Sequence, residues 1–201
     1  HFAGKVNGKF GVNSENAFYS PFSLLLALGM CVTGAREETL ESLSSVLGCP
    51  ITLNEQRAFF KQLMNEIRSE NAAYELKTAN ALWHQNNVSI NPEWSDIIRE
   101  DLKATVAGVD FETNTAAAIE EINNWCNTNT NNKISKIVNN DTVTEETVSV
   151  LTNAIYFKGK WKKQFNKKNT TKSVFHGANG DTTPWIMHTR INQDLPAEKG
   201  E

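Results

Sequence analysis

Apolar residues recur at helical spacing through the first half of the chain. The segment from Phe22 to Val32 is apolar on nearly all sides. It follows Ser20-Pro21, a suitable helix start because Ser caps the first turn and Pro fits it. A helix without a polar face is buried on every side, which requires a large surrounding domain. The same spacing predicts further helices at residues 1–10, 36–47, 52–69, 91–103 and 115–128.

Strand patterns are concentrated later in the chain. Residues 74–84 and 104–111 are predicted strands, and residues 147–157 are β-forming and apolar on both faces. Such a strand is typical of the middle of a covered sheet. Shorter strands are expected at 16–19, 172–175 and 185–189. Helices mostly first and strands mostly later indicate an α+β fold rather than a regular βαβ alternation.

Composition narrows the classes of partner. The 201 residues carry a net charge of −3, and the longest apolar run, Leu24 to Val32, is far shorter than the ~20 residues of a membrane span. We therefore expect neither a membrane nor a nucleic-acid partner, since a duplex binder needs clustered cations. One basic cluster, Lys158 to Lys172, contains Trp161 and Phe165. A solvated strand and loop is the favoured interpretation, and a nucleic-acid surface is the alternative.

The sequence contains no recognisable catalytic or metal-binding motif. It lacks the G-x-S-x-G, H-E-x-x-H, Walker, G-x-G-x-x-G and C-x-x-C patterns, and its four histidines lie far apart. We therefore expect no enzyme activity, no metal and no cofactor. The three cysteines, Cys31, Cys49 and Cys126, form an odd set without short spacing, so a disulfide framework is not expected. Cys31 and Cys126 are predicted to be apolar core thiols, and a reactive thiol is the less favoured alternative.

Six segments in order along the chain carry a family resemblance. They are Asn16–Ser23 with the apolar helix after it, Gly34-Ala35 with Thr39, Ala79–Trp83, Val109–Phe111, Ile122–Trp125 with Thr130–Ile134, and Leu151–Trp161. Together they resemble the serpins, the superfamily of serine protease inhibitors. The resemblance implies an α+β serpin-like fold, in which helices A–F pack on a central mixed sheet A beside parts of sheets B and C.

A serpin domain is considerably longer than this chain. Residues 1–201 are therefore expected to be the N-terminal portion of a single domain, truncated before the reactive-centre loop. On their own they are expected neither to fold stably nor to inhibit. The resemblance implies suicide inhibition, in which the cleaved loop inserts into the main sheet as a new strand. A non-inhibitory serpin, acting as a carrier, storage protein or chaperone, is the alternative, and the missing hinge before the loop would discriminate between them.

The resemblance also assigns a polar cluster beneath the centre of the sheet. Ser20, Ser23 and Asn153 match this cluster, the shutter, at which the strands part. Small hydroxyls and an amide suit that role because they can exchange hydrogen-bond partners. The alternative is a plain helix cap at Ser20 and a satisfied buried amide at Asn153.

Further residues match other parts of the opening machinery. Trp161 matches the position where the loop enters the sheet, and Ile122 and Trp125 match the helix that crosses the sheet face. Simple packing is the alternative for all three. Asn132 stands where the family most often has Gly, and Asn also tolerates the left-handed conformation. His188 follows Met187 where two Met residues are common.

The expected partner is a target protease, of serine type rather than cysteine type, bound by a monomeric full-length protein. Secretion is expected from the family's usual location, with a cytoplasmic form as the alternative. Three sequons would accept N-linked glycans in a secreted protein. They are at Asn87, Asn140 and Asn169.

Overall fold

The computed structural model describes residues 2–4, 20–67, 74–161, 164–177 and 180–187. The predicted strand at 16–19 and most of the predicted helix at 1–10 lie outside these residues; residues 2–4 are helical. The chain forms two compact units, one made of residues 1–12 and 17–158 and the other of residues 13–16 and 159–201. They are called the larger and the smaller unit.

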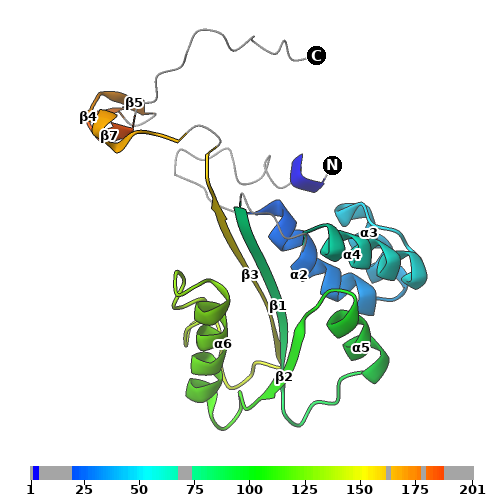
Figure 1. The fold of residues 1–201 in the computed structure, drawn as a ribbon. Helices are drawn as coiled ribbons and strands as arrows, with labels where there is room; N and C mark the ends of the chain where they lie inside the picture. Colours follow the sequence, from blue (N-terminus) through cyan, green and yellow to red (C-terminus); the bar gives the residue numbers. More distant parts are fainter. Residues whose placement is uncertain (1, 5–19, 68–73, 162–163, 178–179, 188–201) are drawn as a thin grey trace. The chain divides into compact units, whose positions relative to one another are not determined.

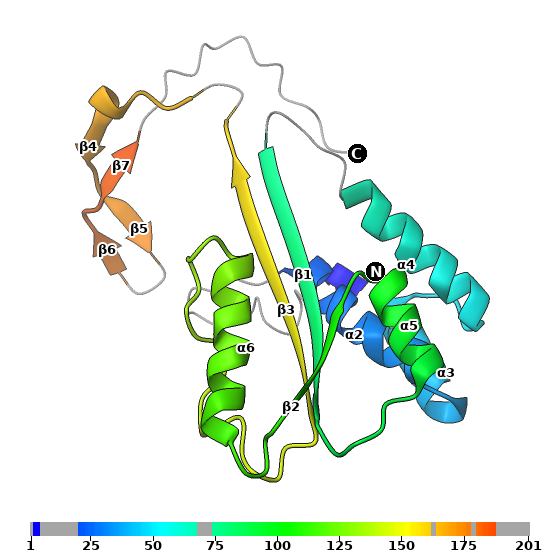
Figure 2. The ribbon, with the colours of Figure 1, turned by 60° about the horizontal axis from the view of Figure 1, so that its bottom comes forward.

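The larger unit combines helices with one mixed sheet (Figure 1). Its elements are α2 (Pro21–Gly34), α3 (Glu37–Leu47), α4 (Leu53–Ile67), β1 (Tyr74–Gln85), α5 (Pro92–Glu100), β2 (Thr105–Val109), α6 (Thr115–Asn129) and β3 (Ser149–Gly159). The strand order is β2-β1-β3. β1 is parallel to β2, and Ala81 pairs with Thr105. Figure 2 shows β3 running opposite to β1, so the sheet is mixed, as the family resemblance implies.

The first helix begins where the sequence predicts. The Ser20 hydroxyl accepts a hydrogen bond from the Ser23 backbone N–H at 3.2 Å, and Pro21 occupies the first turn. α5 starts in the same way, with the Asn91 side chain accepting from the Trp94 N–H at 3.1 Å. Polar caps followed by Pro are therefore reliable start signals in this chain.

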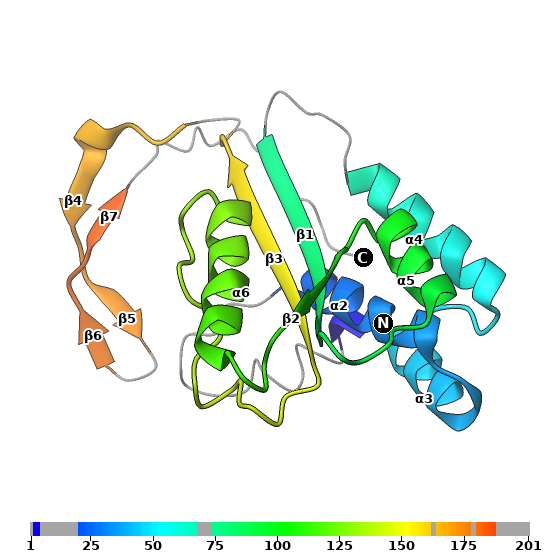
Figure 3. The ribbon, with the colours of Figure 1, turned by 90° about the horizontal axis from the view of Figure 1, so that it is seen from below.

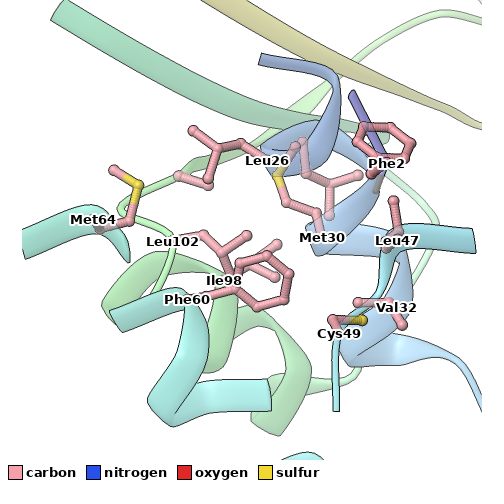
Figure 4. Close-up of a cluster of buried hydrophobic side chains, with 12 residues drawn as sticks. Phe2, Leu26, Met30, Val32, Leu47, Cys49, Phe60, Met64, Ile98 and Leu102 are labelled. Carbon is pink, nitrogen blue, oxygen red and sulfur yellow. The ribbon is translucent and has the colours of Figure 1, made fainter. Parts of the chain in front are cut away.

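One face of the sheet packs against α2 and α5, and α3 and α4 pack on α2. Figure 4 shows the core that they form. Its buried members are Phe2, Leu26, Met30, Val32, Leu47, Cys49, Phe60, Met64, Leu82, Ile98, Leu102 and Ala104. α2 lies at its centre, which explains why this helix has no fully polar face. Figure 3, seen from below, shows these helices on one side of the sheet and α6 on the other.

The opposite face of the sheet packs against α6. Its core is a second cluster, made of Ala81, Trp83, Val109, Phe111, Ala118, Ile122 and Val143. Successive side chains of a strand point to opposite faces. Leu82 of β1 accordingly belongs to the α2 core, while Ala81 and Trp83 belong to the α6 core. Helices thus lie on both faces of the three-stranded sheet that the described residues form.

An ion pair joins α4 to the end of α5. Arg57 Nε donates to Asp101 Oδ2 at 2.6 Å, and the Asp101 side chain is only 2% exposed. A buried carboxylate needs such a partner because losing its hydration is costly. The bond holds α4 against the segment that leads into β2.

The smaller unit consists of short strands. They are β4 (Thr170–Lys172), β5 (Phe175–Gly177), β6 (Gly180–Thr182) and β7 (Trp185–Met187), and the 3-10 helix η1 (Lys167–Asn169) precedes them. β4 pairs with β7 and β5 pairs with β6, both antiparallel. The predicted strand at 172–175 is wrong, because the chain breaks there into two strands with different partners. β6 was not predicted, since its sequence, Gly-Asp-Thr, carries no apolar alternation.

Two expectations in the larger unit also differ from the structure. α5 ends at Glu100 rather than near 103, and Lys103 has a left-handed φ of 54°, which a right-handed helix excludes. β3, predicted to lie in the middle of its sheet, is an edge strand of the sheet formed by the described residues. Its outer edge carries no strand there, although Leu151 packs against the α2 core on one face and Val150 packs against the α6 core on the other.

A substitution of Gly29 on α2 tests the packing of the core that contains α2. A Cβ at this position would lie 2.6 Å from Cε1 of the fully buried Phe60. We expect Gly29→Ala in the full-length protein to lower the free energy of unfolding by about 1–2 kcal/mol, because overpacking costs about 1–3 kcal/mol and better helix propensity recovers about 0.5–1 kcal/mol. Urea unfolding measures this. The double variant with Phe60→Leu is the control, and its loss should be smaller than the sum of the single losses.

Candidate functional site

A chain of side-chain hydrogen bonds runs from α2 to the centre of the sheet. The Ser20 hydroxyl caps α2 at Ser23, and the Ser23 hydroxyl donates to Asn153 Oδ1 on β3. Asn153 Nδ2 then donates to Asn80 Oδ1 on β1 at 2.5 Å. Asn80 Nδ2 in turn donates to the backbone carbonyl of Leu102 at 3.2 Å. The structure therefore brings together all three residues of the predicted shutter.

Asn80 is a fourth member of this cluster, and the family resemblance does not assign it to the shutter. It is buried, and both halves of its amide are hydrogen-bonded. The alternation along β1 contains the signal, because Asn80 shares its face with Leu82 and therefore points into the α2 core. A polar residue on a core-facing position needs a partner. The identity of that partner, Asn153, depends on a strand register that the local sequence does not show.

A second cross-strand bond lies on the opposite face of the sheet. Trp83 Nε1 on β1 donates to Thr152 Oγ1 on β3 at 3.0 Å, and both residues are buried. Trp125 of α6 meets the Trp83 ring edge to face, with centroids 6.0 Å apart. Ile122 of α6 is fully buried in the same core. Ile122 and Trp125 thus lie on the helix that covers the sheet, as predicted, and their part in strand insertion stays a prediction.

The segment after α6 is also fixed to that helix. The Asn123 side chain accepts from the backbone N–H groups of Ile137 and Val138 at 2.7 and 3.1 Å, and donates to the Val138 carbonyl at 3.0 Å. The turn before it contains Asn131 and Asn132 with left-handed φ values of 50° and 59°. The expectation that Asn132 tolerates the left-handed conformation is confirmed. α6 and the chain leading to β3 therefore form one connected layer.

A groove follows the outer edge of β3. It has a volume of about 870 Å³ and is lined by Ser20, Pro21, Lys133, Ile155, Tyr156, Phe157 and Lys158. Its lining includes consecutive residues of β3, whose side chains alternate between faces. The groove therefore follows the unpaired edge of the strand and reaches the first residue of the shutter.

The remaining predicted site residues have simpler surroundings. Trp161 belongs to the smaller unit, is 71% exposed and packs edge to face on Phe165 at 5.9 Å between centroids. Its assignment to the loop-entry position stays a prediction. Lys172 lies over the Trp185 ring at 5.4 Å. The sequon residues Asn87, Asn140 and Asn169 are exposed.

The three thiols differ in accessibility. Cys49 and Cys126 are buried, whereas Cys31 is half-buried, and all three are free. Burial raises the pKa of each of them, which favours the thiol over the thiolate. The described residues contain no group of three or more His, Cys, Asp or Glu side chains arranged to hold a metal ion. Among the helices in the described part of the chain, none is long and apolar enough to cross a membrane.

Comparison with known proteins identifies the family. The sequence model of the family described as serpin (serine protease inhibitor) matches residues 1–198. The chain belongs to the serpin family. It is 36% identical to an uncharacterized serpin-like protein of Thermococcus kodakarensis over 177 residues, covering 88% of this chain and 41% of that protein. Its identity to human Serpin B3 is 34% over 176 residues, which cover 80% of this chain and 45% of that protein.

Solved structures agree with this assignment and confirm the predicted fold. Emu ovalbumin aligns with a TM-score of 0.82 at 28% identity, over 92% of this chain and 51% of that one. Serpin-12 of Manduca sexta aligns with a TM-score of 0.81 at 30% identity, over 94% of this chain and 53% of that one. The chain thus spans about half the length of the serpins that it matches. Serpins are generally inhibitors rather than catalysts.

The Trp83–Thr152 bond can be tested by an isosteric substitution. We expect Thr152→Val to lower the free energy of unfolding of the full-length protein by about 1–3 kcal/mol, because it leaves the buried Trp83 N–H without an acceptor. Thr152→Ser, which keeps the hydroxyl, should retain most of the stability. Thr105→Val, on an exposed position of β2, is the matched control. Equal unfolding midpoints for Thr152→Val and wild type in urea would contradict the assignment.

A substitution of Asn153 tests the role of the shutter. Asn153→Ala removes the acceptor of Ser23 and the donor to Asn80. We expect the closed sheet of the full-length protein to loosen, so that mild heating produces polymers or a latent monomer, which native gels resolve. Asn124→Ala, on an exposed position of α6, is the matched control. The prediction fails if the monomer content of Asn153→Ala stays equal to that of the control.

Proposed function

We propose that the full-length protein inhibits an endopeptidase, of serine type, by inserting a cleaved loop into the sheet. The loop would follow the present residues, and the protease would cleave it and remain attached as an acyl-enzyme. The residues present would then form part of the sheet that receives the cleaved loop. The sheet would open at a defined place and accept the loop as a new strand.

The Ser20–Ser23–Asn153–Asn80 cluster beside the outer edge of β3 is the observation that supports this proposal. An extended segment adds to such an edge through main-chain hydrogen bonds, while pockets beside the edge take alternate side chains. The edge is bordered by the groove of about 870 Å³ and by the Ser20–Ser23–Asn153–Asn80 cluster. Thr152 on one face of β3 and Asn153 on the other bond to side chains of β1, so the outer edge is the free side of the strand among the described residues.

The chemistry of the cluster suits a site that opens and closes. Ser hydroxyls rotate and can donate or accept, and an Asn side chain carries both a donor and an acceptor. Such groups can exchange partners without leaving a buried charge. A carboxylate or ammonium at the same place would pay a much larger desolvation cost when its partner leaves.

A non-inhibitory role is the alternative proposal. The fold is as similar to an ovalbumin as to the Manduca sexta serine protease inhibitor. Fold similarity alone therefore does not discriminate between the two roles. The hinge that precedes the reactive loop does, because small residues there permit insertion and bulky or charged ones block it.

Incubation of the full-length protein with a panel of serine and cysteine proteases tests the proposal. We expect a complex with at least one serine protease that survives SDS, together with a stoichiometric loss of protease activity. The same protein with the loop cleaved beforehand is the control and should form no complex. If every protease of the panel cleaves the loop and is released active, the inhibitory proposal is wrong and the non-inhibitory one is supported.

A further inference from the structure

A second pocket lies at the other end of β3 and shares no residue with the edge groove. Its volume is about 380 Å³, within the range of small-molecule sites. Five elements and the segments beside them converge on it: the end of α2, the start of α3, the start of α5, and β1 and β3. The lining residues are Cys31, Gly34, Ala35, Arg36, Thr39, Leu82, Asn91, Trp94, Ser149 and Leu151.

The floor of this pocket is apolar and preformed. Leu82 and Leu151 contribute aliphatic surface from the two strands, and Trp94 contributes an indole ring. The ring is fixed because its Nε1 donates to the Met30 carbonyl at 2.9 Å. Gly34 allows this position, since a Cβ there would lie 2.8 Å from Trp94 Nε1. The Trp94 ring is therefore held in place without a ligand.

The rim of the pocket favours an anion. Its lining contains one cation, Arg36, and no Asp or Glu. Among the described residues Arg36 forms no ion pair, and only its Nη1 is engaged, with the Ala35 carbonyl at 2.8 Å. Asn91 accepts through Oδ1 from the Trp94 N–H, which leaves its Nδ2 as a donor. Thr39 adds a hydroxyl.

We propose that this pocket binds a small amphipathic carboxylate or sulfonate, with its apolar body on Trp94 and Leu151 and its anionic group at Arg36. Charge complementarity favours this ligand, because the Arg36 guanidinium at the exposed rim can pair with an anion, whereas it would repel a cation. The site is independent of protease inhibition. It involves neither the shutter nor the outer edge of β3.

Cys31 provides a reporter for occupancy. It lines the pocket and is half-buried, whereas Cys49 and Cys126 are buried elsewhere in the core. A disulfide reagent should therefore react with Cys31 before the other two thiols. A ligand in the pocket should slow this reaction without affecting the exposure of the other cysteines.

The test uses the full-length protein with decanoate and 8-anilinonaphthalene-1-sulfonate as probes. We expect saturable sulfonate fluorescence that decanoate displaces, and slower labelling of Cys31 when decanoate is bound. Arg36→Gln should weaken decanoate binding by about tenfold or more. Thr39→Phe should block the mouth and abolish binding. Lys61→Gln and Ser45→Phe are the matched controls, because both positions are exposed and neither lines the pocket.

Several results would overturn the proposal. Decanol binding as tightly as decanoate would show that Arg36 recognises no anion. Sulfonate fluorescence that persists in both Arg36→Gln and Thr39→Phe would place the dye on other apolar surface. Labelling of Cys31 at the same rate with and without decanoate would show that decanoate does not occupy the pocket. The SDS-stable complex is measured separately in the same variants, so failure here and failure of the inhibitory proposal are distinguishable.

Discussion

The side-chain amide of Asn153 connects the parts of the larger unit that meet at the sheet. Its oxygen accepts from Ser23 on α2 and its nitrogen donates to Asn80 on β1, while its own backbone belongs to β3. An amide can do this because it carries a donor and an acceptor on one planar group. Both bonds stabilise the core, because a buried polar group without a partner would lose its hydration without compensation.

The two faces and the outer edge of β3 have different surroundings because the strand is pleated. Leu151 and Asn153 face the helices α2 to α5, and Val150 and Thr152 face α6. Each face carries one side-chain hydrogen bond to β1, with Asn153 bonded on one side and Thr152 on the other. The strand is thereby fixed to its inner neighbour from both sides. Any rearrangement that preserves these bonds must take place at the outer edge.

The order of helices and strands could be predicted because its signals are local. Ser20-Pro21 and Asn91-Pro92 fix helix starts within a few residues. The all-apolar α2 lies at the centre of a core, as its pattern predicts, but its burial is not complete because Leu24 is exposed. The end of α5 cannot be predicted from its sequence, because the left-handed φ of Lys103 is not encoded by a Gly. The break between β4 and β5 has no local signal, because it depends on which strands pair.

The candidate site could be predicted only in part, because it depends on contacts between residues that are distant in the sequence. Ser20, Ser23 and Asn153 could be grouped only through the family resemblance, since Ser23 and Asn153 are 130 positions apart. Trp83 and Thr152, 69 positions apart, have no such signal, and neither residue type predicts the other. Their meeting depends on the register of β1 against β3, because a shift by one residue would turn Thr152 to the opposite face of the sheet. The same register brings Leu82 and Leu151 together in the floor of the second pocket. One alignment of two strands therefore determines both cross-strand bonds and the shape of the pocket.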